Sequence, residues 1–222
     1  MRTQSLRQVL VYKHVLLDGR LALFHQRQRW LAVADLHFGY ELSHRAAGNL
    51  FPLWGMRNIQ ARLDELLRDY QPKVLILLGD LVHDRAGAKD LSLLIKHLER
   101  TCDVVLISGN HDRPLKQAGS SGHRFLDFWR CKDFYFHHGD CETEVQNCIQ
   151  IIGHHHPTAA IRDGAGLRLK LPAFIQEKNC WIMPAFSPWA AGAGWVDEDD
   201  AGKVWLCSSD RILPFERPRG LV

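Results

Sequence analysis

The sequence predicts an α/β fold built on a parallel or mixed sheet. In the first half of the chain, short apolar runs typical of strands alternate with segments whose apolar residues have helical spacing. In the second half strand-like runs predominate, and the 222 residues suit a single domain covering residues 1–222. Ligands of such sheets bind at the carboxyl ends of the strands, so the residues that end each run are the candidates for function.

The first elements expected are a hairpin and a short strand. Val15–Leu17 and Leu21–Phe24 flank Asp18-Gly19, a dipeptide typical of hairpin turns. Trp30–Ala34 is an apolar run that stops at Asp35. It therefore predicts a strand that delivers an acidic residue at its end.

Two helices are expected in the first half of the chain. Met56–Tyr70 has apolar residues at helical spacing, and Pro72 closes this helix. Leu91–Leu98 repeats the helical pattern. Each predicted helix precedes a further apolar run, which is the alternation that indicates parallel strands.

Four more apolar runs stop at polar clusters. The runs are Lys73–Leu78, Val104–Ile107, Phe134–Phe136 and Ile149–Ile152. The clusters that follow them are Gly79-Asp80, Gly109-Asn110-His111-Asp112, His137-His138-Gly139-Asp140 and Gly153-His154-His155-His156. Weaker strand candidates lie at Leu167–Leu171, Cys180–Ile182, Val204–Leu206 and Ile212–Leu213. With Asp35-Leu36-His37, five runs end in Asp, Asn or His, and we expect these residues to converge.

The residue types at these ends suit a pair of divalent metal ions. Two cations about 3.5–4 Å apart need oxygen and imidazole ligands, and a shared carboxylate lowers their repulsion. Asp35 and His37 lie two apart, so their side chains share one side of an extended strand end, as do those of His154 and His156. Asn110 supplies a neutral oxygen. The set therefore predicts a hydrolytic site with two metals rather than a closed zinc site of four ligands.

Composition limits the other classes of function. The net charge of +3 permits a nucleic-acid partner without arguing for one. The six cysteines form no CxxC pair and are expected to be free thiols. No apolar run approaches the roughly 20 residues of a membrane span, and the first residues do not resemble a signal peptide. We therefore expect a cytoplasmic protein that has no membrane partner.

The five polar clusters resemble the motifs of the calcineurin-like metallophosphoesterase superfamily over roughly residues 30–157. The resemblance implies a four-layered α/β/β/α sandwich, in which two mixed sheets are flanked by helices. It implies that the first metal is held by Asp35, His37 and His156, that Asp80 bridges, and that the second metal is held by Asn110, His138 and His154. His111 is expected to protonate the leaving oxygen after attack by a hydroxide that the metals activate, and Asp112 is expected to orient His111.

Several neighbouring residues have two interpretations. His137 and His138 are adjacent and point to opposite faces, so only one reaches the metals; we select His138. Arg45, Arg113 and His155 are candidate substrate-binding residues, although a surface or packing role is open for each. His83 and Asp84 are left between a site role and a loop or helix-cap role. The aromatic pair Trp189 and Trp195 could stack on a base or serve packing.

A finer resemblance covers nearly the whole chain. After the first motif come Arg45, Gly48 and Pro52, and the chain later carries Leu171-Pro172-Ala173-Phe174 and Pro184-Ala185-Phe186. These positions resemble the bacterial ligase-associated DNA damage response endonuclease (PdeM-like) branch. That branch implies a manganese-dependent phosphodiesterase that cuts single-stranded DNA in repair, in functional association with a DNA ligase and a helicase.

Other functions stay open from the sequence alone. The same site could serve a general small-molecule phosphodiesterase or phosphomonoesterase, or the fold could be a non-catalytic scaffold. Iron, zinc or cobalt suit the ligands as well as manganese does. The sequence does not define the natural substrate or the oligomeric state, and a homodimer is one option.

Overall fold

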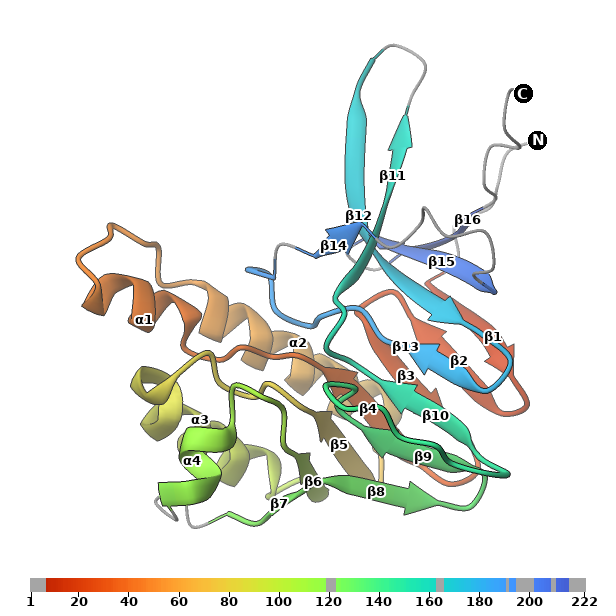
Figure 1. The fold of residues 1–222 in the computed structure, drawn as a ribbon, viewed down its shortest axis with the longest axis horizontal. Helices are drawn as coiled ribbons and strands as arrows, with labels where there is room; N and C mark the ends of the chain where they lie inside the picture. Colours follow the sequence, from red (N-terminus) through yellow and green to blue (C-terminus); the bar gives the residue numbers. More distant parts are fainter. Residues whose placement is uncertain are drawn as a thin grey trace.

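The computed structural model describes residues 7–118, 123–162, 166–190, 192–194, 202–208 and 211–215 (Figure 1). Its helices are α1 (Tyr40–Ala46), α2 (Gly55–Tyr70), the 3-10 helix η1 (Arg85–Gly87), α3 (Ala88–Leu98) and α4 (Arg113–Ala118). The strands of its first sheet are β1 (Gln8–Tyr12), β2 (Val15–Asp18), β3 (Ala22–His25), β4 (Trp30–Ala34), β5 (Val74–Leu78), β6 (Asp103–Ile107) and β7 (Phe125–Leu126). The strands of its second sheet are β8 (Phe128–Cys131), β9 (Phe134–His137), β10 (Ile149–Ile152), β11 (Pro157–Arg162), β12 (Arg168–Gln176), β13 (Cys180–Ile182), β14 (Ala193–Gly194), β15 (Lys203–Ser208) and β16 (Arg211–Phe215).

The first sheet has the order β1-β2-β3-β4-β5-β6-β7. Strands β4 to β7 run parallel, whereas β1 to β4 pair antiparallel. Every residue of β4 is buried, as is usual for a parallel strand that is covered on both faces. The parallel arrangement brings the carboxyl ends of β4, β5 and β6 to one edge of the sheet.

The second sheet is also mixed. Strand β10 pairs parallel with both β9 and β13, whereas β8, β12, β15 and β16 join by antiparallel pairs. Strands β11 and β12 form a hairpin that rises away from the body of the molecule, at the top of Figure 1. The carboxyl ends of β9 and β10 lie side by side, so the residues after both strands can meet.

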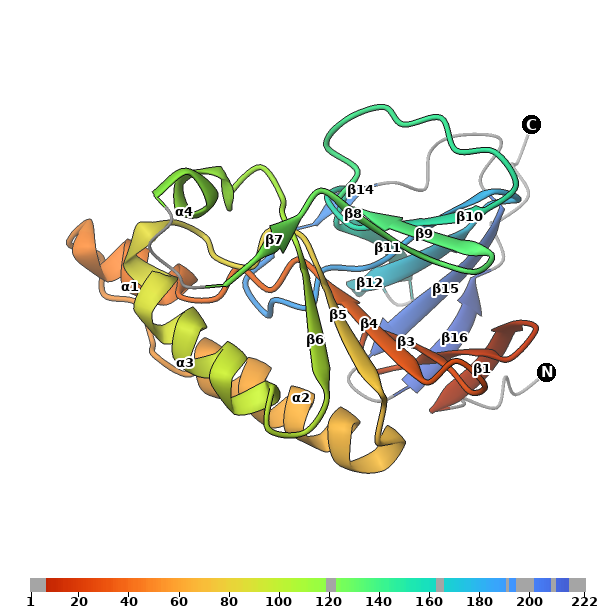
Figure 2. The same cartoon turned by 90° about the horizontal axis from the view of Figure 1, so that it is seen from below.

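The helices cover the first sheet. Figure 2 shows α2 and α3 on the side of β4, β5 and β6 that faces away from the second sheet. All the described helices precede residue 119, and the described elements that follow are strands. The prediction of an α/β sandwich with two mixed sheets and helices is confirmed. No described helix is both long and apolar enough to span a membrane.

Aromatic side chains join the two sheets. Trp30 of β4 meets Phe134 and Phe136 of β9 edge-on, at ring-centroid distances of 5.2 and 5.1 Å. These three side chains are at most 1% exposed. Backbone bonds add to the packing, since Phe186 N donates to Ala34 O at 2.7 Å at the end of β4. The strand ends that carry the polar residues therefore lie next to a buried apolar core between the two sheets.

Local structure departs from the predictions at several places, of which two lie on either side of the first polar cluster. The expected hairpin forms, but Asp18 stays in β2 and pairs with Ala22, and the turn consists of Gly19 to Leu21. Leu21 takes the left-handed conformation there, with φ of 69°. The short helix α1 was not predicted, because its seven residues include only two strongly apolar side chains, Tyr40 and Leu42. The six cysteines are free, as expected.

Candidate metal centre

The polar residues from five strand ends meet at one place. They follow β4, β5, β6, β9 and β10. Two groups of side chains have potential ligand atoms within 4.8 Å of one another. The first group is Asp35, His37, Asp80 and His156; the second group is Asp80, His138 and His154. The two groups share only Asp80, which is the arrangement expected of a bridging carboxylate.

Short distances separate the ligand atoms of the first group. His37 Nε2 lies 3.3 Å from His156 Nε2 and 3.9 Å from Asp80 Oδ2. His156 Nε2 lies 3.4 Å from Asp35 Oδ1. The two imidazoles therefore turn the same ring nitrogen towards one point, between two carboxylates.

The second group is as tight. His138 Nε2 lies 3.4 Å from Asp80 Oδ1 and 3.2 Å from His154 Nδ1. The amide oxygen of Asn110 lies 3.2 Å from the same His138 nitrogen. Asn110 thus lies beside the second group.

Burial makes these contacts costly without a cation. Asp35 is fully buried, and Asp80 and His138 are 3% and 1% exposed. The His37 and His138 rings both turn Nε2 to the centre, and among the described residues their buried Nδ1 atoms on the other side have no hydrogen-bond partner. Buried carboxylates and imidazoles are normally paired or bound to metal ions, so this donor set fits two divalent cations.

The backbone of the centre is unusual as well. Five residues of the two groups have positive φ, a conformation that side chains other than glycine rarely adopt. They are Asp35 (54°), His37 (43°), Asp80 (46°), His154 (66°) and His156 (45°). Such conformations cost about 1–3 kcal/mol each and persist where the surroundings enforce them, commonly at active sites.

Glycines of two motifs make room for a side chain from another motif. A Cβ atom at Gly79 would lie 1.9 Å from His138 Nδ1, and one at Gly153 would lie 2.5 Å from Asp35 Oδ2. Gly79 also has a φ of 71°, which favours glycine over other residues. The glycines before Asp80 and His154 are therefore required by packing across the two sheets.

Backbone N–H groups hold the two carboxylates in place. His154 N lies 3.1 Å from both carboxylate oxygens of Asp35. His111 N donates to Asp80 Oδ1 at 2.9 Å. Each acid is thus braced by a strand end other than its own, which fixes its orientation before a ligand arrives.

The electrostatics of the centre suit cation binding. Burial lowers the pKa of His37 to about 3, and burial together with His138 lowers the pKa of His154. Burial alone would raise the pKa of Asp80, but His138, the His111 backbone N–H and His37 together outweigh it and hold that pKa at about 2. Neutral imidazoles and an ionised carboxylate are the forms that bind metals. Burial acts against the charge on His138, but Asp80 and Asp35 raise its pKa.

The structure corrects the expected role of Asp112. Its buried carboxylate accepts hydrogen bonds from the backbone N–H groups of Gly109, Leu81 and Val82, at 2.9 to 3.1 Å. Burial raises the pKa of Asp112 to about 6 in spite of these bonds. Asp112 therefore joins the loops after β5 and β6, and it does not orient the His111 ring.

A backbone carbonyl orients His111 instead. His111 Nδ1 lies 2.8 Å from the carbonyl oxygen of His83. Because a carbonyl only accepts, Nδ1 carries the hydrogen, and Nε2 is the nitrogen left for a substrate. The His111 ring also meets the His37 ring edge-on at 5.1 Å, so it borders the first group.

His138, and not His137, lies in the centre. His137 Nε2 lies 2.9 Å from Gln150 Oε1, on the opposite face of the second sheet's strand ends. The alternation of side chains along β9 thus separates the two histidines in the way the sequence predicted.

The three candidate substrate-binding residues are not alike. Arg113 is 62% exposed and donates to Asp140 Oδ2 at 2.7 Å, beside the second group. His155 packs against His154 with ring centroids 5.3 Å apart. Arg45 is exposed on α1, and it lies outside both groups. Trp195 lies outside the described residues.

The structure also reveals residues that the sequence left undecided or missed. His83 forms a further nitrogen cluster with His37 and His111. Asp84 caps η1 by accepting from Ala86 N at 2.8 Å, which confirms its helix-cap role. Arg85 lines a hollow of about 560 Å³ with His111. The only signal for Arg85 in the sequence is its position shortly after Asp80.

Comparison with known proteins places this geometry in a family. The sequence matches the family described as "Calcineurin-like phosphoesterase" over residues 29–210. The fold is similar to the crystal structure of Pseudomonas putida nuclease MPE, with a TM-score of 0.74 and 25% identity, covering 96% of this chain and 100% of that chain. A phosphoesterase from E. coli, Yfce, is more distant, with a TM-score of 0.44 and 16% identity, covering 82% of this chain and 90% of that chain.

The search of curated proteins gave no match. The family match nevertheless spans well over half of the chain, and the two cation groups that share Asp80 lie within it. The protein is a phosphoesterase enzyme, and its chain belongs to the calcineurin-like phosphoesterase family.

Proposed function

We propose that the protein is a manganese-dependent phosphodiesterase that cuts single-stranded DNA, as in the ligase-associated DNA damage response branch. The observation that carries the proposal is the pair of cation groups joined through Asp80, with the His111 ring beside them. The similar fold of a protein named as a nuclease supports the choice of a nucleic-acid substrate.

In this proposal the two groups hold two divalent ions. Asp35, His37 and His156 would hold the first, Asn110, His138 and His154 would hold the second, and Asp80 would be shared by both. Divalent ions held there would supply Lewis-acid chemistry, which lowers the pKa of a water molecule and neutralises charge on the phosphate oxygens. Nitrogen and oxygen donors suit manganese, and they also suit iron, zinc and cobalt.

His111 acts on the leaving group. The His83 carbonyl fixes the ring, and its Nε2 can therefore donate a proton to the departing sugar oxygen when the ring is protonated. The fixed position of the His111 ring matters, because proton transfer requires that Nε2 lies within hydrogen-bond distance of the leaving oxygen. The neighbouring hollow with Arg85 leaves space for the departing strand.

A panel of metals and substrates tests the function. Purified protein is supplied with manganese, iron, zinc or cobalt and assayed on single-stranded DNA, a bis-nitrophenyl phosphodiester and a nitrophenyl monoester. Asp80→Ala is the blank, because it removes the carboxylate that both groups share. We expect manganese to support cleavage of both diesters. Turnover of the monoester alone would contradict the assignment as a phosphodiesterase. Turnover equal to that of Asp80→Ala would contradict the assignment of the active site to the two cation groups.

The leaving-group role of His111 gives a sharper prediction. A sugar hydroxyl is a poor leaving group and needs the proton, whereas nitrophenolate does not. His111→Ala should therefore lose about 10²–10⁴-fold of DNA cleavage, the usual range for general acid catalysis, and much less of the nitrophenyl diester turnover. His137→Ala is the control, since His137 contacts Gln150 and lies outside both cation groups. Equal losses of His111→Ala on both substrates would remove the proton-donor role.

The proposal extends to partners. In the branch that the sequence resembles, the enzyme is associated with a DNA ligase and a helicase. Co-elution of the purified chain with each of these enzymes on a sizing column is the expected result. Separate elution at micromolar concentration of each protein would reject a direct association.

A further inference from the structure

A series of rings leads from the metal centre to α1. His111 stacks on His83 with ring centroids 5.3 Å apart and planes at 27°. The His83 ring lies 4.6 Å from the Tyr40 ring, and Tyr40 lies 4.4 Å from His44 on the same helix. Figure 1 shows that α1 projects away from the two sheets, so the rings connect the centre with a protruding part of the molecule.

The series continues across the loop between α1 and α2. Phe51 stacks on His44 at 4.9 Å and 22°, and it meets Trp189 edge-on at 4.7 Å. Trp189 lies 4.3 Å from Trp54. We call Tyr40, His44, Phe51, Trp54 and Trp189 the aromatic arm. It is one continuous set of ring contacts with its inner end at His83.

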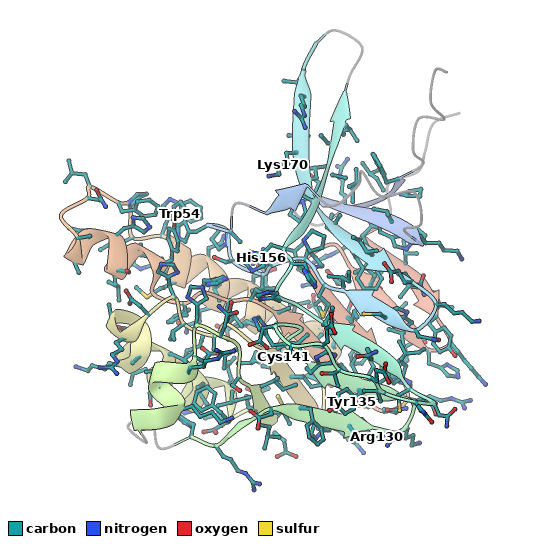
Figure 3. The ribbon with its side chains drawn as sticks, viewed as in Figure 1. Trp54, Arg130, Tyr135, Cys141, His156 and Lys170 are labelled. Atoms are coloured by element: carbon teal, nitrogen blue, oxygen red, sulfur yellow. The ribbon has the colours of Figure 1, made fainter. Side chains whose placement is uncertain are left out.

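The outer end of the aromatic arm exposes apolar surface. Trp54 is 48% exposed, and its loop neighbours Leu50 and Leu53 are 101% and 43% exposed. Figure 3 shows the labelled Trp54 on the projecting segment and the labelled His156 nearer the middle of the molecule. A cluster of exposed apolar side chains near an active site marks a surface that contacts a ligand or partner.

A buried carboxylate holds the arm in shape. Glu41 is fully buried and accepts hydrogen bonds from Met56 N at 2.7 Å and from Trp189 Nε1 at 3.1 Å. Gly55 leaves the space that Trp189 occupies, because a Cβ atom there would lie 2.0 Å from Trp189 Nε1. The rings are therefore ordered before binding, which reduces the entropy lost when a ligand binds.

The charges around the arm favour a polyanion. Arg45 on α1 and Arg57 on α2 are exposed. Between residues 40 and 58 the one carboxylate is Glu41, whose charge is buried. The exposed Trp54 ring beside two arginines, on a segment whose one acid is buried, matches the flat bases and charged phosphates of an unpaired strand.

We propose that the aromatic arm stacks an unpaired base of a single-stranded nucleic acid whose scissile phosphate lies at the metal centre. Trp54 makes the outermost contact, and Arg45 and Arg57 lie beside the neighbouring phosphates. This inference rests on the proposed function, because the diester that the arm positions is the one cleaved. It gives the enzyme a preference for unpaired strands, since paired bases do not offer their faces.

Binding to matched oligonucleotides tests the arm. The full chain, as isolated and without added metal, is titrated with a ten-residue oligothymidylate and with an abasic strand of the same length. Trp54→Ala should weaken binding of the oligothymidylate by roughly 5- to 150-fold, the usual effect of losing one base–aromatic stack, and leave the abasic strand unchanged. Trp54→Phe should restore most of the binding. Leu93→Ala, at a leucine 58% exposed on α3, is a control that should change neither.

Three results would overturn the inference. The first is wild-type affinity of Trp54→Ala for oligothymidylate. The second is an equal loss for both strands, which would indicate a contact with phosphates. The third is a dimer that Trp54→Ala disrupts without changing oligonucleotide binding, which would indicate a protein interface. Turnover of the bis-nitrophenyl diester, which has no base, is measured alongside. Its absence in the wild type removes the proposed function, whereas the binding results still decide the role of the arm.

Discussion

Two buried polar clusters of this protein differ in how their groups are partnered. Asp18 accepts hydrogen bonds from the Arg20 guanidinium at 2.8 and 3.0 Å and from the Tyr70 hydroxyl at 2.6 Å. In the metal centre, similar groups face one another, as His37 and His156 do through nitrogens 3.3 Å apart. The first cluster is complete within the chain, whereas the second places buried acids and imidazoles around points that need a cation.

The backbone conformation also differs between the two clusters, being regular around Asp18 and strained in the metal centre. Asp18 lies in a regular strand pair, while Asp35 at the end of β4 has a φ of 54°. Burial would raise the pKa of Asp18, but Arg20 and Tyr70 outweigh burial and lower it. Burial of polar groups therefore does not by itself indicate function. Function is indicated where buried groups of the same kind face one another on residues with strained backbone, because folding alone does not favour that arrangement.

The largest effect is expected from the neighbouring histidines at the end of β9, His137 and His138. His138→Asn should lower diester turnover by about 10³-fold or more, since even partners that only support a metal ligand are worth 10–100-fold. His137→Asn is a matched control, because His137 contacts Gln150 and should lose no more than a few-fold. Manganese should also raise the melting temperature of the His137 variant more than that of the His138 variant. Equal losses of activity would contradict the assignment of His138.

A smaller effect is expected when the complete cluster is broken. Asp18→Asn should lower the free energy of unfolding by about 3 kcal/mol, near the lower limit for breaking a buried ion pair, because Arg20 keeps its contact with Asp69. Its turnover per folded molecule should match the wild type. Urea unfolding and the diester assay measure the two quantities. A loss of turnover without a loss of stability would mean that the two clusters are coupled.

The smallest effect concerns pH. The pKa of Asp18 is lower in the folded chain than its unfolded value of about 3.9, so its contribution to stability is complete above that value. The contribution is lost as the pH falls through the folded-state pKa. The difference in unfolding free energy between wild type and Asp18→Asn should therefore be smaller near pH 3 than near pH 6. An equal difference at both pH values would show that the carboxylate charge is not the cause.

The convergence of the candidate ligands could be predicted from the sequence because its signal is local. An apolar run followed by Asp or His places a side chain at a strand end, and parallel strands bring their ends together. The role of Asp112 could not be predicted, because its partners are backbone N–H groups of another loop, which no side-chain pattern records. The same holds for the His83 carbonyl.

Long-range packing hid other features. Asp18 has the sequence of a turn residue, and only the approach of Tyr70, 52 residues later, makes it a buried anion. The aromatic arm brings Trp189 against a loop 135 residues earlier in the chain, through a carboxylate on α1. The residue types at these positions are compatible with such contacts, but they do not predict which distant residues will meet.

A crystal soaked in manganese tests the metal centre most directly, through the anomalous scattering of the bound ions. Two peaks about 3.5–4 Å apart are expected, both in contact with the Asp80 carboxylate. Asp35, His37 and His156 should surround one peak, and Asn110, His138 and His154 the other. A single peak, or two peaks of which Asp80 touches only one, would contradict a centre in which one buried carboxylate joins two cations.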